Sequence, residues 1–329
     1  MPTIKDVANL AGVSVGTVSR VLAKNDTVKP KLQLKVEQAV KQLRYKPNAV
    51  ARALRKNSTD VIGLIVPDIT NPFFAELAKY TEMEAAKRGL SVMLANTHGD
   101  PAFQTQQLDI LLDRSPLGVL VVSAANADTK PLDTEIPIIA IDRDFADYPC
   151  IATDHEASAK LAAVYLLELG HRKIGYAAGP ENTQVAQTRE AGFLAGIAET
   201  AKRMNIEPDI EILRGAFDFH TGESLGKAFL DRSPSDRPSA IATASDQQAI
   251  GIMRVARDLN ISIPDDLSVI GFDDIPLAAL VTPRLSTIRQ SVPEIAKAAI
   301  DAMTKQDHNI NIPSFPGQLI LRGSCKQRT

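Results

Sequence analysis

The sequence predicts a small all-α helix-turn-helix domain joined to a two-lobed α/β core of doubly wound parallel sheets. The first observation is a pair of short amphipathic helices, joined by a glycine turn, at residues 4–22. The second is the alternation of short apolar runs and helical patterns from Val61 onward, which is typical of parallel sheets covered on both faces. The third is charge, because residues 1–57 hold 12 Lys and Arg against 3 Asp and Glu, whereas the remaining residues hold 25 against 36. A basic head on an acidic body indicates that the head binds a polyanion.

The segment Ile4–Leu22 predicts the two head helices. Apolar residues recur at helical spacing in both halves of this segment. Between them, Gly12 can take the positive φ that ends a helix, and Ser14 is a natural N-cap for the next one. A third helix, expected at Lys31–Leu43, can cover the apolar faces of the first two. This arrangement places the second helix in the major groove of DNA, although a glycine turn alone also occurs in ordinary helical hairpins.

The string DVAxxAGVSxxTVSRVL over Asp6–Leu22 resembles the DNA-binding headpiece of the LacI/GalR family of bacterial transcriptional regulators. The resemblance extends from Thr3 to about Ile320. It implies a DNA-binding head over residues 1–47, a hinge helix and linker over 48–58, and a periplasmic-binding-protein-like type I core over 59–329. In such a core, lobe 1 comprises about 59–157 and 290–317, and lobe 2 comprises about 158–289 and 318–329. The implied crossings between lobes lie near Ala157–Leu161, Arg289 and Gln318.

Arg20 on the second helix is the best candidate for reading a base, because arginine can pair bidentately with guanine. Val15 and Gly16 occupy the positions that the family uses for base discrimination, yet neither carries a hydrogen-bonding side chain. We therefore expect specificity to depend partly on DNA deformability. Contacts to the DNA backbone would set the register of the head without reading the sequence. The other head residues predicted to contact DNA, mostly its phosphates, are Thr3, Ser14, Thr17, Ser19 and Asn25.

Residues 49–56 predict a helix of only about two turns, which is marginal in isolation. The resemblance implies that this hinge helix forms on the operator and that a leucine from it enters the minor groove. Leu54 is the matching residue, and Ala51 and Arg55 flank it. A side chain wedged in this way partly unstacks a base step and bends the duplex. The alternative is an ordinary connecting helix.

The core is expected to contain two successive sets of strands and helices, with a ligand site between the lobes at the carboxyl ends of the strands. The strands are expected at Val61–Val66, Leu90–Ala95, Gly118–Val122, Ile138–Ile141, Lys173–Ala178, near Ile212, Ala240–Thr243 and Leu267–Gly271. The helices are expected at Pro72–Lys87, near Pro101–Asp113, Ser158–Leu169, about Thr188–Met204, after His220, and at Ser245–Leu259.

Carboxylates and aromatic rings at strand ends suit a sugar-like effector, since a carboxylate can accept two hydrogen bonds from adjacent hydroxyls. The resemblance favours Phe73 and Phe74 for this site and assigns Arg189 to an arginine that engages ligand in the second lobe. The alternatives are core packing for the phenylalanines, a solvated arginine, and helix capping alone for Asp246. The predicted effector-binding residues are Phe73, Phe74, Asp142, Arg189, Phe217, Asp246 and Asp273.

The segment Gly179–Val185 lacks the basic residue that purine-binding relatives place there, which favours a sugar, sugar phosphate or nucleoside over a purine base. The five histidines pair with no serine or cysteine motif, and Cys150 and Cys325 lack metal-ligand spacing. We therefore expect an effector-controlled transcriptional repressor without enzymatic activity, cofactor or metal. The absence of a signal-like start and of a membrane span predicts a cytoplasmic protein.

Three other functions use similar folds. The first is a regulator controlled chiefly by a protein coregulator. The second is a periplasmic solute-binding protein, which the basic head and the absence of a signal-like start argue against. The third is a doubly wound enzyme with an accessory DNA module, for which the sequence offers no convincing catalytic set.

One head offers a small footprint, and such modules gain affinity by binding as dimers to half-sites related by two-fold symmetry. We predict a homodimer on a pseudo-palindromic operator in double-stranded DNA. The affinity should fall steeply as salt concentration rises, because Lys and Arg contacts to phosphates release counterions. Fluorescence anisotropy with a labelled operator at increasing KCl concentration measures this slope. An affinity independent of salt, or equal binding to a scrambled palindrome, would contradict the prediction.

Overall fold

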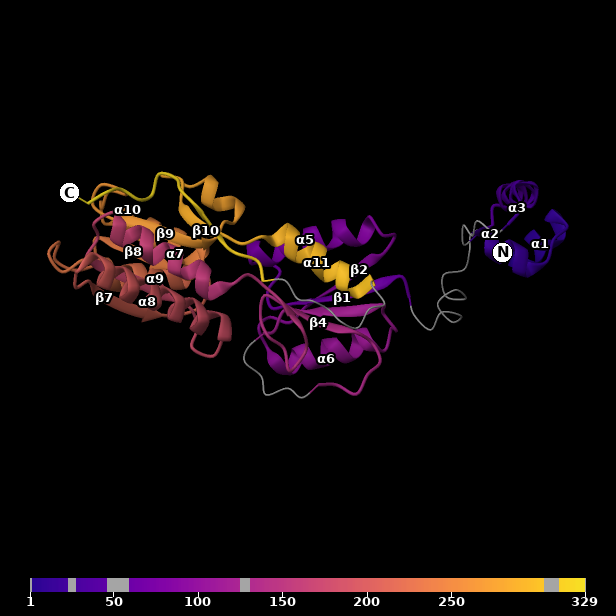
Figure 1. Cartoon of the computed structure of the whole chain (residues 1–329), viewed down its shortest axis with the longest axis horizontal. Helices are drawn as coiled ribbons and strands as arrows, with labels where there is room; N and C mark the ends of the chain where they lie inside the picture. The colour runs from indigo at the N-terminus through magenta and orange to yellow at the C-terminus, as the bar shows by residue number, and fades with distance from the viewer. Residues whose placement is uncertain (1, 23–27, 46–58, 125–130, 305–313, 329) are drawn as a thin grey trace. The chain divides into compact units, whose positions relative to one another are not determined.

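The computed structural model describes residues 2–22, 28–45, 59–124, 131–304 and 314–328 (Figure 1). The chain divides into two compact units, Met1–Thr59 and Asp60–Thr329. Within the described ranges, no helix is long and apolar enough to cross a membrane.

The first unit contains the predicted helix-turn-helix. Its helices are α1 (Ile4–Ala11), α2 (Val15–Leu22) and α3 (Pro30–Leu43). Gly12 ends α1 with a φ of 65°, and the Ser14 hydroxyl accepts a hydrogen bond of 3.2 Å from the backbone N–H of Thr17. Each helix contributes one fully buried valine to a shared hydrophobic cluster: Val7, Val18 and Val36. The turn, the cap and the apolar spacing of the sequence thus produce the fold that they predict.

The second unit begins with a five-stranded parallel sheet in the order β2-β1-β3-β4-β5, which forms lobe 1. Alternate residues of its strands bury on opposite faces, so that Leu64 packs with the α5 side and Ile65 with the α6 side. Helix α11 returns late in the chain and lies beside α5 (Figure 1). The elements are β1 (Val61–Val66), α5 (Pro72–Ala86), β2 (Ser91–Asn96), α6 (Pro101–Leu112), β3 (Gly118–Val121), β4 (Ile138–Ile141), β5 (Cys150–Ile151) and α11 (Val292–Thr304).

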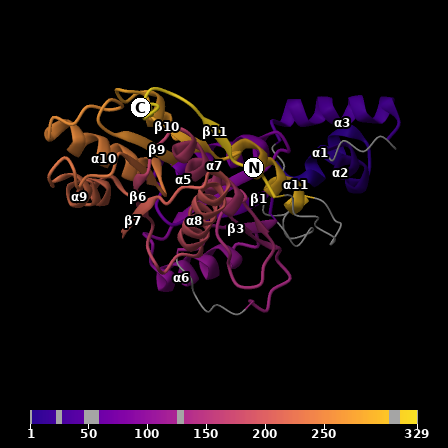
Figure 2. The ribbon, with the colours of Figure 1, turned by 60° about the vertical axis from the view of Figure 1, so that its left-hand side comes forward.

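Lobe 2 is built on a six-stranded sheet in the order β11-β10-β9-β8-β6-β7, parallel except for β11. Helices α7 and α8 cover one face, where they pack side by side (Figure 2), and α9 and α10 cover the other. The elements are α7 (His155–Glu168), β6 (Lys173–Ala178), α8 (Gln184–Met204), β7 (Asp209–Arg214), α9 (Phe219–Leu230), β8 (Ala240–Thr243), α10 (Asp246–Asp258), β9 (Ser268–Asp273), η1 (Pro276–Ala279), β10 (Ser286–Arg289) and β11 (Gln318–Ile320).

Helices α7 and α10 differ from the prediction because the residue that caps each helix is not the one expected. Asp154 accepts from the N–H of Ala157 at 2.9 Å, so α7 begins at His155 and the first crossing precedes it, rather than lying at Ala157–Leu161. Ser245, not Asp246, is the N-cap of α10. The short strands β5, β10 and β11, helix α11 and the 3-10 turn η1 were not among the expected elements.

The two helix pairs of lobe 2 approach closely because glycines lie at their contacts. A Cβ added to Gly192 on α8 would lie 2.2 Å from the carbonyl oxygen of Glu156 on α7. A Cβ at Gly251 on α10 would lie 2.3 Å from the carbonyl oxygen of Phe219 on α9. Since backbone atoms cannot move aside as a flexible side chain can, these contacts set the spacing of both pairs.

Gly192→Ala should therefore destabilise the core by about 1–3 kcal/mol, the usual cost of overpacking, despite the better helix propensity of alanine. Urea unfolding followed by circular dichroism measures the change in the free energy of unfolding. The matched control is Lys202→Ala, an exposed position on the same helix, which should leave stability within about 0.5 kcal/mol. If both variants had the same free energy of unfolding, α7 and α8 could move apart without loss of stability, which would contradict the prediction.

Candidate functional site

The exposed face of α2 presents the residues predicted to meet DNA. Ser14, Val15, Gly16 and Arg20 are exposed, and Thr17 is half-buried. The Arg20 Nε donates a hydrogen bond of 3.3 Å to the carbonyl oxygen of Gly16, so the guanidinium lies along the helix surface with its other donors available.

The remaining predicted DNA contacts divide into two groups. Thr3 is exposed, and its hydroxyl forms a capping box with Asp6 at the start of α1, while Ser19 is half-buried on α2. The others, Asn25, Ala51, Leu54 and Arg55, lie outside the described residues.

In the core unit, polar side chains meet between the lobes at the carboxyl ends of strands. Both sheets contribute, because parallel strands end at one edge of each sheet. Asp142 and Arg143 follow β4, His155 opens α7, Arg189 lies on α8, Asp273 ends β9, and Gln290 follows β10. We call these six residues the interlobe cluster.

Arg189 is the hub of the cluster. Its Nη1 donates to the carbonyl oxygen of Ala244 at 2.6 Å and lies 3.4 Å from Asp273 Oδ1. Its Nε donates to His155 Nδ1 at 3.3 Å. The side-chain amide of Gln290 also donates to Asp273 Oδ1, at 2.8 Å, so one carboxylate oxygen receives donors from two elements.

Asp142 forms the lobe 1 side of the cluster. The His155 Nε2 lies 3.2 Å from its carbonyl oxygen and 3.3 Å from its Oδ1, and the Arg143 Nε lies 3.8 Å from its Oδ2. Asp142 and Asp273 adopt positive φ values of 63° and 116°, which are costly for residues other than glycine. Such strain concentrates at functional sites, where it aims a side chain.

Burial controls the charges of the cluster, because Asp142 and Arg189 are each only 4% exposed. Burial raises the pKa of Asp273 to about 7, against the opposing effect of Arg189 and Gln290. Burial also acts to raise the pKa of Asp142, but the hydrogen bond from His155 and the nearby arginines outweigh it, so this pKa lies below its usual value. Two guanidinium groups therefore face one full and one partial negative charge, and the net charge of the cluster is less than one positive charge.

Several polar atoms of the cluster lack good hydrogen-bond partners. Six buried side-chain nitrogen or oxygen atoms in the described ranges make no hydrogen bond of good geometry, and three of them belong to the cluster: Gln290 Oε1, Asp142 Oδ1, which lies 3.3 Å from His155 Nε2, and Arg143 Nε, which lies 3.8 Å from Asp142 Oδ2. A buried polar atom without a partner costs about 1–3 kcal/mol, so these atoms mark a place where a polar ligand would be stabilised. The described residues include no group of three or more His, Cys, Asp or Glu placed to hold a metal ion.

Aromatic rings line the cluster. The Arg143 Cζ lies 5.2 Å from the ring centroid of Phe74 in lobe 1 and 5.8 Å from that of Phe217 in lobe 2. The Arg189 Cζ lies 3.9 Å from the ring of Phe272 and 5.8 Å from that of Phe217. Phe73 packs edge-on against Phe74, and both rings belong to the same hydrophobic core cluster.

Asp246 does not reach the cluster and must be reassigned. It is fully buried, with one oxygen accepting from the backbone N–H of Ile275 at 2.8 Å and the other from the Thr287 hydroxyl at 2.5 Å. Burial and the neighbouring Asp273 hold its pKa well above the usual value, and its two hydrogen bonds tie α10 to the segment after β9 and to β10. Both the effector contact and the helix cap predicted for it are replaced by this structural role.

Sequence reasoning missed Arg143, His155, Gln290 and Phe272. Arg143 and Phe272 adjoin predicted residues at strand ends, so the strand pattern itself could have found them. Gln290 follows the strand at the predicted second crossing. No sequence pattern indicated that His155 is a site residue, apart from its position shortly after a short apolar run.

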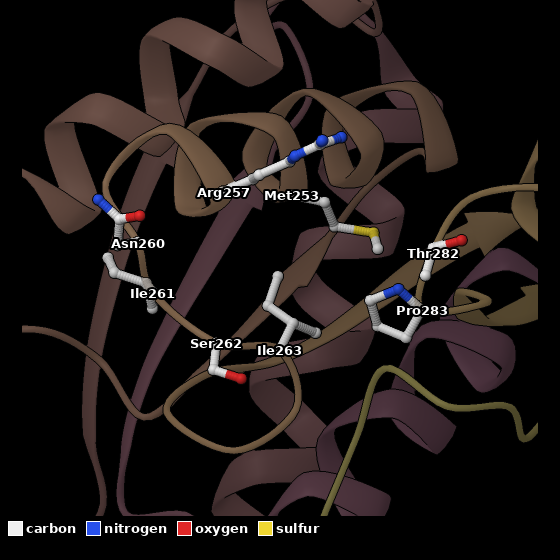
Figure 3. Close-up of a pocket in the computed structure, with 8 residues that line it drawn as sticks. All are labelled: Met253, Arg257, Asn260, Ile261, Ser262, Ile263, Thr282 and Pro283. Carbon is white, nitrogen blue, oxygen red and sulfur yellow. The ribbon is translucent and has the colours of Figure 1, made fainter.

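A separate pocket of about 320 Å³ lies at the opposite end of the lobe 2 strands, since the segments that line it precede β9 and β10 (Figure 3). It is open to solvent, and Arg257 is the one charged residue in its lining. The lining residues are Met253, Arg257, Asn260, Ile261, Ser262, Ile263, Thr282 and Pro283. None belongs to the interlobe cluster.

Comparison with known proteins agrees with this architecture. Residues 3–48 match the family model described as bacterial regulatory proteins, lacI family, and residues 163–325 match a periplasmic binding protein-like domain. The ribose operon repressor of Escherichia coli (strain K12) is 34% identical over 338 residues, covering 99% of this chain and 100% of that protein.

Two solved structures are also similar. The lac repressor dimer bound to operator and the anti-inducer ONPF has a TM-score of 0.82 and 26% identity and covers 99% of each chain. A periplasmic binding protein/LacI transcriptional regulator from Alkaliphilus metalliredigens QYMF, complexed with D-xylulofuranose, has a TM-score of 0.69 and 27% identity, covering 81% of this chain and 99% of the other. Together with the helix-turn-helix head and the two-lobed core, these similarities show that the chain belongs to the lacI family of bacterial regulatory proteins and is a DNA-binding transcriptional regulator.

Proposed function

We propose that this regulator is a repressor that binds a pseudo-palindromic operator as a homodimer, under the control of a neutral, pentose-sized sugar bound at the interlobe cluster. The observation that carries the proposal is the set of buried polar atoms on Asp142, Arg143 and Gln290 that make no hydrogen bond of good geometry, gathered between lobes that each contribute an arginine and an aspartate.

The chemistry of the cluster suits a polyol. Carboxylates accept hydrogen bonds from hydroxyls, guanidinium groups donate to hydroxyl and ring oxygens, and an amide such as Gln290 does both. The rings of Phe74 and Phe217 can pack against the apolar face of a sugar ring. Because a ligand must enter a site that is now buried, binding requires the lobes to part and to close again around it.

The small net charge of the cluster argues against a sugar phosphate. Arg143 already faces Asp142 and Arg189 already faces Asp273, so the nearly two negative charges of a buried phosphate would exceed the positive charge that remains. The D-xylulofuranose bound to the Alkaliphilus structure and the ribose operon repressor similarity both support a pentose.

Control of DNA binding requires that the sugar bind the operator-bound and free conformations with different affinities. In this proposal the sugar changes DNA binding through residues 48–58, where Leu54 enters the minor groove with Ala51 and Arg55 beside it. The head residues that contact DNA are Thr3, Ser14, Thr17, Ser19, Arg20 and Asn25. The dimer in the lac repressor–operator structure supports two heads on one operator. The proposal also includes a head that ends at residue 47, a hinge that ends at residue 58 and a core that begins at residue 59. It includes the absence of enzymatic activity.

We expect D-ribose or D-xylulose to bind, and D-ribose 5-phosphate to bind at least tenfold more weakly. Asp273→Asn and Arg189→Lys should each weaken sugar binding by roughly tenfold or more, the scale of a lost hydrogen bond to a charged group. Isothermal titration calorimetry on the full-length protein measures affinity, and operator anisotropy with and without the sugar measures the response.

The matched control is Arg257→Ala in the separate pocket, which should leave sugar affinity unchanged. A sugar response abolished by Arg257→Ala but retained by both cluster variants would move the effector site to that pocket. Preferential binding of the phosphate would refute the charge argument.

A further inference from the structure

His155 links the two lobes of the core at the point where the chain crosses between them. It is the first residue of α7, directly after the crossing segment, and Asp154 caps the helix. The crossing is held beside another crossing segment, because Asp154 N–H donates to the carbonyl oxygen of Phe315 at 2.8 Å and Phe315 N–H donates to that of Ala152 at 3.3 Å. The backbone of His155 is thus fixed at the hinge.

The ring of His155 contacts one charged residue on each side. Its Nε2 approaches the carbonyl oxygen and the Oδ1 of Asp142, from lobe 1, at 3.2 and 3.3 Å. Its Nδ1 lies 3.3 Å from the Nε of Arg189, from lobe 2. The ring of Phe272, at 6.1 Å between centroids, packs against it, and the side chain is 7% exposed.

These partners determine where the ring carries its proton. A guanidinium N–H can only donate, so Nδ1 must present a lone pair to Arg189. The single ring proton therefore lies on Nε2 and is donated to the carbonyl oxygen of Asp142, beside its Oδ1. The neutral Nε2–H form satisfies both contacts, whereas a doubly protonated ring would set an N–H against the N–H of Arg189.

We propose that His155, in its neutral Nε2–H form, is a positioning residue that holds Asp142 and Arg189 in the geometry that binds the effector, and that its protonation weakens effector binding. The inference rests on the proposed function, because it concerns the same site. His155 itself does not need to touch the effector, since it acts through the two residues that it holds.

The charged groups around the ring agree with this assignment. Burial and the positive charge of Arg189 lower the pKa of His155, and the opposing effect of Asp142 does not reverse this direction. Arg143 and Asp273 are the next charged groups, each in contact with Asp142 or Arg189 rather than with the ring. Because the closed cluster favours the neutral ring, effector affinity should be full above the usual histidine pKa of about 6.5 and should fall as the pH decreases below it.

The first test needs no effector. Long-range ¹H–¹⁵N correlation spectra of the full-length protein, labelled at histidine, report which ring nitrogens carry protons, and the His155 signals are assigned by their loss in His155→Gln. We expect a single proton on Nε2 at a pH of about 7.5. A proton on Nδ1, or on both nitrogens, at this pH would overturn the proposal.

The second test measures D-ribose affinity by calorimetry at pH values of about 7.5 and 5.5 in the unsubstituted protein, His155→Gln and the control His220→Gln, which alters an exposed histidine on α9. The unsubstituted protein and the control should lose roughly tenfold in affinity on acidification. His155→Gln should bind roughly tenfold more weakly at the higher pH and lose much less on acidification. Asp273 also titrates in this range, in all three proteins, so the differences between profiles isolate His155.

Identical pH profiles in His155→Gln and the unsubstituted protein would refute the proposal. Circular dichroism checks that the variant is folded, and His155→Asn replaces it if it is not. If D-ribose binds none of the proteins, the proposed effector class is wrong. The position of the ring proton, measured in the first test, then supports or overturns the role of His155 by itself.

Discussion

The core depends on the mutual compensation of buried charges where its two lobes meet. Arg189 from one lobe faces Asp273 directly and Asp142 of the other lobe through His155. Each Arg–Asp pair lies within one lobe, and the contacts of His155 with Asp142 join the two, so parting the lobes would separate the ring from Asp142 while both pairs stay formed. The site proposed for the effector lies at this boundary, because a polyol could supply hydrogen bonds to the polar atoms there.

The three crossings convert this local chemistry into motion of whole lobes. The first and third crossings are hydrogen-bonded through Ala152, Asp154 and Phe315, and the second leads through Gln290, which donates to Asp273. A rotation of one lobe must therefore bend segments that are themselves attached to the cluster. Since a ligand shifts an equilibrium only by its differential affinity for the two states, contacts at these segments are well placed to generate that difference.

The sequence predicted most of the architecture, because its main elements are specified locally by apolar runs, caps and glycine turns. Asp142 and Asp273 could be predicted as site residues since both end strands whose carboxyl ends meet. Asp246 follows a strand in the same way, yet it opens a helix, and its side chain turns inward to Thr287 and Ile275. His155 and Gln290 escaped prediction because crossings, not patterns, bring them to the cluster, and α11 returns to lobe 1 from a distant part of the chain.

Val15 and Gly16 are exposed on the head and take no part in its hydrophobic core. Neither residue belongs to the small core formed by Val7, Val18 and Val36, and an added Cβ at Gly16 would meet only the Ser14 hydroxyl, at 3.8 Å. Substitutions at these two positions can therefore change the surface that α2 presents while the head folds as before. This part of the head can vary without compensating changes in its hydrophobic core.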